Sequence, residues 1–164
     1  MRLDTAQRQG GIIIFATFIA ALLLTMMPLP DWGETLRPEW VAMVLIYWCI
    51  ALPNRVGVFI AWFVGLFLDV ASGALLGQNA VAMALIAYLA IKLHLRIRLF
   101  PLWQQAMSVL VLVALYQMLT LWIKGMIGAT TQGWSYWVHS LTSMLMWPVV
   151  FLLLRYIRRY FKVR

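Results

Sequence analysis

The chain has 164 residues, of which 65% are hydrophobic and 11% are charged, and its mean hydropathy is +0.90. This composition excludes an ordinary soluble domain and predicts an integral membrane protein that forms one compact unit. The formal net charge is +8, but the basic residues fall at the expected membrane edges, so nucleic-acid binding is not needed to explain it. The single cysteine, Cys49, excludes an internal disulfide and a cysteine-based metal cluster.

Apolar stretches recur along the chain at lengths near the roughly 20 residues that a membrane span needs. The first is not interpreted as a cleaved signal peptide, because Met26-Met27-Pro28 stands where small residues would mark a cleavage site. The second is the shortest and is bounded by prolines. We therefore predict one all-α membrane domain over residues 1–164, with helices at about 11–28, 38–52, 56–71, 79–95, 104–124 and 134–154 and a basic tail at 155–164.

The distribution of Lys and Arg predicts the orientation of these spans. With the N-terminus in the cytoplasm, one face of the membrane receives eleven of the thirteen basic residues. The other face keeps Arg37 and Lys124 and takes the acidic residues of the loop at 28–39. An even number of spans with both termini in the cytoplasm is therefore expected.

Residues 57–77 carry one acid among glycines. Gly65, Asp69, Gly73 and Gly77 are four apart, so in one continuous helix they would share a stripe with Ser72 beside it. Small residues at this spacing allow another helix to approach closely, and a membrane acid faces the bundle interior. We expect this stripe to fix the central helix of the fold. One alternative is that the glycines only loosen a re-entrant or turning segment and that Asp69 caps a following short helix. The other is that Asp69 has a direct chemical role.

Two later segments add polar groups to the expected bundle. Gln117 lies at about the same depth as Asp69, so we predict a hydrogen bond between the Gln117 amide and the Asp69 carboxyl. His139 and Ser143 share a helix face near the outer side and are candidates for an outer pocket, although a lone histidine is more often structural. Pro148 is expected to interrupt and kink the last span.

Two basic clusters lie at the expected cytoplasmic edge. They either extend to lipid headgroups or bind a cytoplasmic partner, and for the C-terminal cluster anionic lipid contact is a sufficient explanation. The clusters consist of Lys92, Arg96 and Arg98, and of Arg155, Arg158, Arg159 and Lys162.

The sequence offers little material for catalysis. Four of the five acids precede residue 40, and no paired acids, activated nucleophile, phosphate-binding loop or set of metal ligands is found. We predict no enzyme activity, no metal and no cofactor. A scaffold whose surface binds other membrane proteins is one of the functions that the residues leave open. A small-ligand-binding or transport protein is the alternative, because a few interior polar groups suffice to hold a ligand.

Several motifs resemble the bacterial rod shape-determining protein family MreD and occur in the same order along most of the chain. They are RPEW at 37–40, YW at 47–48, ALPNRVG at 51–57, GLFLDVASG at 65–73, LG at 76–77, MALIAY at 83–88, LWQQA at 102–106 and WP at 147–148.

The resemblance implies a non-enzymatic inner-membrane component of the elongation machinery that makes lateral peptidoglycan in rod-shaped cells. It implies MreC as the direct partner, with MreB, RodA and the elongation-specific penicillin-binding transpeptidase in the wider complex. It also implies a six-helix fold similar to the S components of energy-coupling factor transporters, which keeps the ligand-binding alternative open.

Overall fold

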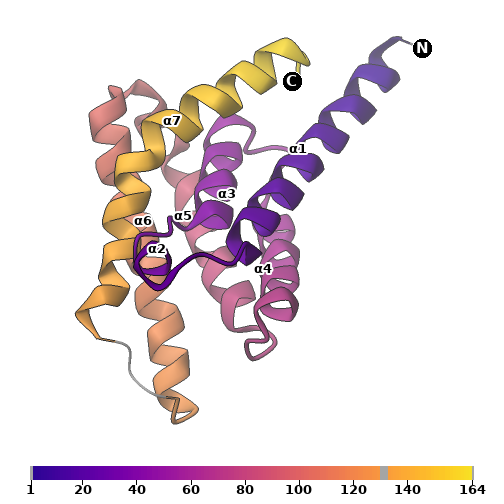
Figure 1. The fold of residues 1–164 in the computed structure, drawn as a ribbon. Helices are drawn as coiled ribbons and strands as arrows, with labels where there is room; N and C mark the ends of the chain where they lie inside the picture. The colour runs from indigo at the N-terminus through magenta and orange to yellow at the C-terminus, as the bar shows by residue number, and fades with distance from the viewer. Residues whose placement is uncertain (1, 130–132, 164) are drawn as a thin grey trace.

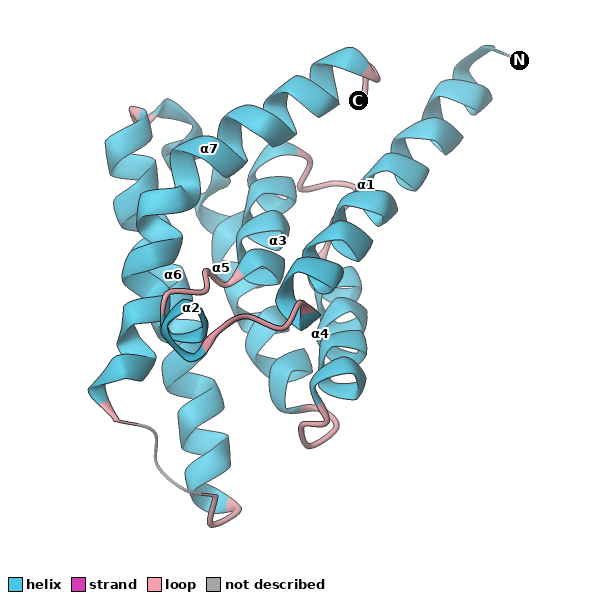
Figure 2. Ribbon diagram, viewed as in Figure 1, coloured by secondary structure: helices cyan, strands magenta, loops and turns pink. Residues whose placement is uncertain are grey.

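The structure, a computed structural model, describes residues 2–129 and 133–163, with side chains from Gly10 onward. The described residues form helices and no strand (Figures 1 and 2). The elements are α1 (Arg2–Met26), α2 (Asp31–Thr35), α3 (Trp40–Ala51), α4 (Val58–Ser72), α5 (Gln78–Leu99), α6 (Leu102–Met126), the 3₁₀-helix η1 (Trp134–Trp137) and α7 (Val138–Tyr160). The prediction of an all-α membrane protein with about six main helices is confirmed.

The main helices run alternately up and down, so both ends of the chain lie at the same end of the bundle (Figure 1). We call this the terminal end, and the opposite end, which holds the α4–α5 turn, the loop end. Three segments are long and apolar enough to cross a membrane by themselves, namely α5, α6 and the segment from η1 through α7. The apolar part of α1 and the helix α4 are shorter.

Helix α3 is the centre of the fold. Every residue from Val41 to Ala51 is buried, and α3 packs against α1, α5, α6 and α7. Its Trp48 indole donates a 2.9 Å hydrogen bond to the Thr17 hydroxyl of α1. Helix α3 has no polar face, so other helices can cover it on all sides. Helix α4, in contrast, exposes a row of large apolar side chains. The expectation that residues 57–77 form the central helix is therefore wrong.

Two arginines satisfy helix carbonyls that have no partner within their own helix. At the terminal end, Arg98 of α5 donates from Nε to the Ile50 carbonyl (2.7 Å) and from Nη2 to the Ala51 carbonyl (2.6 Å), both on α3. At the loop end, Arg37 donates to carbonyls at the end of α1 over 2.6 Å each. Arg98 thus binds the protein's own backbone, which corrects its assignment to lipids or a partner.

Helix α7 continues through Pro148 to Tyr160. The expected interruption at Pro148 and the separate tail from 155 are therefore wrong, because the helix includes both, whereas the kink expected at Pro148 agrees with the change of direction along α7 (Figure 1). Its second half slants across the terminal end of the bundle (Figure 1). Beyond it, Val163 is buried and lies close to Gly10 of α1, which ties the two ends of the chain together.

Candidate functional site at the loop end

Asp69 is a fully buried acid at the junction of α4 and α5. Its Oδ1 accepts hydrogen bonds from the backbone N–H (2.9 Å) and the side-chain amide (2.8 Å) of Asn79. Its Oδ2 accepts from the N–H groups of Gly77 (2.9 Å) and Ala80 (3.4 Å). These donors are the N–H groups that the first turn of α5 leaves without partners. The alternative interpretation of Asp69 as a cap is therefore correct, and the capped helix is the 22-residue α5.

The glycines around Asp69 have different roles from one another. Helix α4 ends at Ser72, which is exposed and bonds only to the Leu68 carbonyl of its own helix. Gly73 (φ 66°) and Gly77 (φ 98°) adopt left-handed conformations in the turn, and a Cβ on either would meet nothing within 4 Å. Their assignment to a packing stripe is wrong, because the helix that would align them has already ended.

Gly65 is the one member of the expected stripe where a neighbouring helix approaches closely. A Cβ at this position would lie 2.4 Å from Cα and 2.7 Å from the backbone nitrogen of Ala80. The backbones of α4 and α5 therefore touch one turn from the Asp69 cap.

A hydrogen-bonded chain connects Asp69 to α6. The Tyr116 hydroxyl donates to Oδ1 of Asn79, whose amide donates to Asp69. Gln117, the next residue, donates instead to the Tyr136 carbonyl (3.0 Å), so the predicted Gln117–Asp69 hydrogen bond is wrong. Sequence reasoning missed Asn79 and Tyr116. The polar pair at 78–79 directly after a glycine was the available signal, since it marks a helix start.

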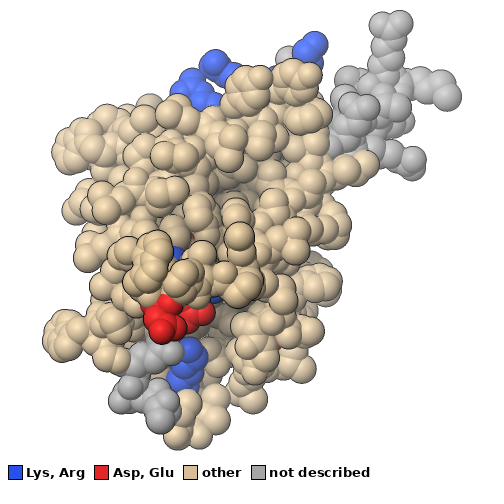
Figure 3. All heavy atoms as spheres, in the orientation of Figure 1, with Lys and Arg blue, Asp and Glu red and all other residues tan. Residues whose placement is uncertain are grey.

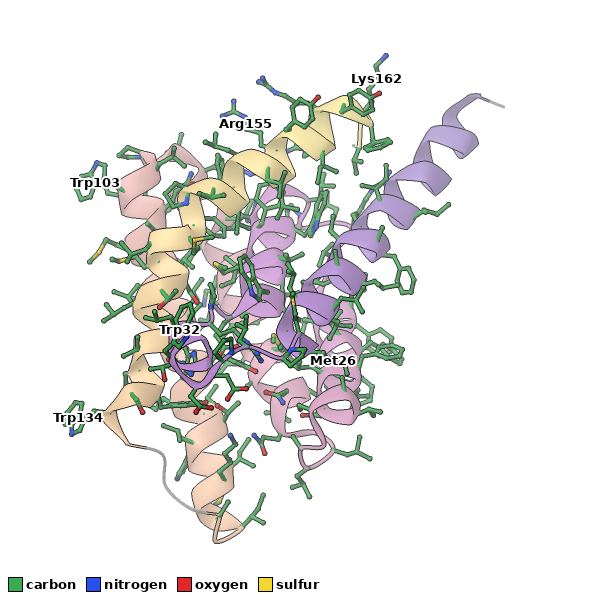
Figure 4. All side chains as sticks on the ribbon, viewed as in Figure 1. Met26, Trp32, Trp103, Trp134, Arg155 and Lys162 are labelled. Carbon is green, nitrogen blue, oxygen red and sulfur yellow. The ribbon has the colours of Figure 1, made fainter. Side chains whose placement is uncertain are left out.

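Two adjoining cavities open beside this cap and form what we call the loop-end chamber. They have volumes of about 500 and 440 Å³ and share Thr25, Glu39 and Tyr136 in their walls. Charged and hydrogen-bonding side chains line them, among them Glu34, Arg37, Asn79, Tyr116, Lys124 and His139. The walls come from α2, the residues that lead into α3, the loop-end turns of α6 and the segment around η1. Figure 4 shows Trp32 of α2 and Trp134 of η1 away from the terminal end, where Arg155 and Lys162 lie.

The chamber holds charges of both signs. Glu39 lies in the electrostatic field of His139, Lys124 and Arg37. The Lys124 ammonium lies 5.7 Å from the centroid of the Tyr136 ring, a cation–π distance. The Nδ1 atom of His139 lies 2.7 Å from the Arg37 carbonyl oxygen, which holds the ring at the chamber wall. A polar ligand would therefore meet two carboxylates, those of Glu34 and Glu39, together with one ammonium and two tyrosines here.

Ser143, the other candidate for an outer pocket, is fully buried and does not line the chamber. Its hydroxyl accepts a 2.9 Å hydrogen bond from the Glu39 N–H and donates a 2.7 Å bond to the His139 carbonyl. It thereby joins the first residues of α3 to α7 beneath the chamber, a positioning role.

A second hollow is apolar and lies between α1 and α4. This α1–α4 groove has a volume of about 530 Å³ and faces the side of the bundle. Its walls include Phe15 and Phe18 of α1 and Phe63 and Phe67 of α4, with Arg55 near the terminal end. An apolar groove on a membrane-embedded surface is a suitable contact for an acyl chain or another helix.

The terminal end carries the basic clusters. In Figure 3, Lys and Arg gather at the top of the molecule, while Asp and Glu gather lower down, over α2, with a further Lys or Arg patch directly below them. Lys92 lies over the Tyr88 ring at 5.8 Å, and Arg96 is exposed. The side chains of Arg155, Arg158, Arg159 and Lys162 line a hollow of about 500 Å³. Among the described residues, no three His, Cys, Asp or Glu side chains gather where they could bind a metal ion.

These features define a small polytopic α-helical membrane protein with a buried, internally capped centre, one polar chamber and one apolar groove. The family model of the rod shape-determining protein MreD matches residues 7–157. The rod shape-determining protein MreD of Haemophilus influenzae is 32% identical over 150 residues, which cover 92% of this chain and 93% of that protein. No solved structure matches, so the expected likeness to S components stays a prediction. The chain belongs to the MreD family.

Proposed function

We propose that this protein is a non-enzymatic scaffold of the rod elongation complex in the bacterial inner membrane, where it binds MreC and supports lateral peptidoglycan synthesis and rod shape. MreB, RodA and the elongation-specific penicillin-binding transpeptidase belong to the wider complex in this proposal. The family match over residues 7–157 carries it, because that range covers α3, α4, α5 and α6 in full and all but the outermost residues of α1 and α7. The excess of basic residues at the terminal end supports cytoplasmic termini.

The surface that we assign to the membrane contact with MreC is the α1–α4 groove. Contacts between α1 and α4 are sparse compared with those between α4 and α5, so the groove is open along the bundle. Phe15 and Phe63 are exposed in its walls and offer large apolar area without a polar group that would need a partner. Packing of this kind drives association between helices in lipid.

Co-purification and cross-linking test the two parts of this proposal separately. The detergent-solubilised chain should co-purify with its cognate MreC. Single cysteines at Phe15 or Phe63, labelled with a photoactivatable thiol reagent, should then cross-link to MreC. Cysteines at the exposed positions Val111 and Leu145, outside the groove, are the matched controls. Native Cys49 is buried and should contribute little background.

The outcomes have distinct meanings. Failure to co-purify at equal folded amounts would refute MreC binding. Co-purification with cross-links only from the control positions would leave the scaffold proposal standing and refute the assignment to the groove.

A second candidate function is small-ligand binding, and the loop-end chamber favours it. A purely structural bundle has no need of a cavity of about 500 Å³ lined by charges of both signs. The amide oxygen of Gln117 is also buried without a hydrogen-bond partner in the described part of the chain, close to Tyr136 in the chamber wall. The chemistry of the wall fits a small polar molecule with both a cationic and an anionic group.

Native mass spectrometry of the purified protein tests this candidate. Ligand binding would be supported by a small molecule that co-purifies with the wild type. The variants Glu39→Gln and Lys124→Gln should lose this molecule, and Asp31→Asn should keep it. Asp31 is a suitable control because it is an exposed acid of α2 outside the chamber wall. A stable complex with MreC and no bound molecule would reject ligand binding and favour the scaffold.

A further inference from the structure

The last turns of α7 differ from the other basic surface at the terminal end because their cations surround a formed hollow. Arg155, Arg158, Arg159 and Lys162 line a cavity of about 500 Å³ together with Val163. Three of the four side chains are exposed, and Arg158 is half-buried beside Tyr47. Four cations at spacings of three and four residues repel one another unless an anion lies between them.

The helix itself does not use these cations as caps. The carbonyls of Ile157, Arg158 and Arg159 accept hydrogen bonds from the backbone N–H groups of Phe161, Val163 and Lys162, respectively, over 3.0 to 3.2 Å. The cationic side chains are therefore not needed to cap the helix. Arg158 lies beside Tyr47, and the other three are exposed to an anion from outside the helix. The described carboxylates do not supply one, since Asp31, Glu34, Glu39 and Asp69 all belong to the loop-end half of the fold.

The hollow is held in place by the backbone that follows α7. Lys162 adopts a positive φ of 51°, which turns the chain back so that Val163 packs into the core. Lysine rarely adopts this conformation, and the burial of Val163 compensates for its cost. The four cations thus converge on a surface of defined shape.

Aromatic side chains flank the cations on the same helix. Tyr156 and Tyr160 are exposed and stacked, with ring centroids 6.1 Å apart, and Phe161 contacts Tyr160 edge-on at 5.0 Å. Leu152 and Leu153, one turn earlier, are exposed and apolar. A helix with cations on one side and Tyr, Phe and Leu beside them has the composition of a segment that lies in the membrane interface, where lipid phosphates are found.

We infer that the hollow lined by Arg155, Arg158, Arg159 and Lys162 binds the phosphate headgroup of an anionic phospholipid, while the adjacent aromatic and leucine side chains contact its acyl chains. The second basic cluster does not form such a site, since Arg98 is bound to α3 and Lys92 lies over Tyr88. The inference is independent of MreC binding and of the loop-end chamber.

A matched pair of variants tests the site. Arg155→Gln with Arg159→Gln removes two cations four residues apart from α7, and Lys92→Gln with Arg96→Gln removes two at the same spacing from α5. Arg158 is left in place because it lies against Tyr47. Binding of cardiolipin, phosphatidylglycerol and phosphatidylcholine to the full-length chain would be measured by native mass spectrometry at equal folded amounts.

We expect the α7 pair to weaken binding of cardiolipin and phosphatidylglycerol by roughly 30-fold, the equivalent of about 1 kcal/mol for each lost cation. The α5 pair should change it by less than about threefold. Equal losses in both pairs would overturn the site in favour of diffuse attraction. Displacement of the lipid by inorganic phosphate at the same concentration would refute a lipid site and show a site for soluble anions. Binding of phosphatidylcholine by the wild type as strong as that of the anionic lipids would also refute the proposal.

Discussion

Asp69 and Asn79 are joined by two hydrogen bonds to one carboxylate oxygen, from the Asn79 backbone N–H at 2.9 Å and from its side-chain amide at 2.8 Å. The pair fixes the end of α4 to the start of α5 inside a membrane-embedded bundle. A carboxylate at this place satisfies several N–H groups at once and meets the positive end of the α5 dipole, so its burial is compensated without an ion pair.

Replacing Asp69 should destabilise the fold more than any other single polar substitution at this turn. Asp69→Ala leaves the N–H groups of Gly77 and Asn79 buried without an acceptor, at about 1–3 kcal/mol for each unsatisfied group. The expected result is a lower unfolding midpoint in detergent and a lower folded yield. Ser72→Ala is the control, because that exposed hydroxyl bonds only within its own helix turn. Equal midpoints for the two variants would contradict the role of Asp69 as a cap.

The two glycines that share a stripe in the sequence should respond differently to alanine. Gly65→Ala places a methyl group 2.4 Å from Cα of Ala80, so α4 and α5 must separate. Gly73→Ala meets no neighbour and costs only the strain of its left-handed conformation, about 1 kcal/mol. Gly11→Ala, in an open part of α1, should be neutral or stabilising. The check is the thermal unfolding temperature of each variant. If Gly73→Ala lowered that temperature more than Gly65→Ala did, the packing contact would not be at Gly65.

Arg98 and Arg96, two residues apart on α5, offer a test of helix capping. Arg98→Gln removes charge-assisted hydrogen bonds to two carbonyls at the end of the central helix and should cost about 1.5–3 kcal/mol. Arg96→Gln removes the same charge from an equally exposed side chain that does not bond to α3 carbonyls, and it should have little effect on stability. Stability would be followed by unfolding in detergent at two salt concentrations. A loss in Arg98→Gln that disappears at high salt would indicate surface electrostatics instead of a cap.

The connection between α6 and the cap can be measured with two double-mutant cycles. Tyr116→Phe and Asn79→Ala should be coupled by at least about 0.5 kcal/mol, because the tyrosine hydroxyl donates to the asparagine side chain. Gln117→Ala and Asp69→Ala should be close to additive, since the two side chains bind different partners. Strong coupling in the second cycle with none in the first would mean that Gln117, and not Tyr116, reaches the Asp69 network.

Much of the fold follows from local pattern. The apolar stretches and the bounding prolines predicted the six main helices, and the position of Asp69 in an apolar stretch indicated a buried acid. The cap was predicted only as an alternative, because a spacing of four residues is equally compatible with one continuous helix through Gly73 and Gly77. The positive φ angles that end this helix depend on how α4 meets α5, and a list of small residues carries no such information.

The class of the protein follows from its amino-acid sequence, since the free energy of transferring these apolar stretches from water into lipid depends on their composition and length. Which helix is central and which polar groups have partners became clear only from the packed fold. The shortest apolar helix, α3, became the core because it has no polar face, and Arg98 became its cap because α5 ends beside it. Such pairings depend on distances between residues far apart in the chain, and these distances are set only when the helices pack together.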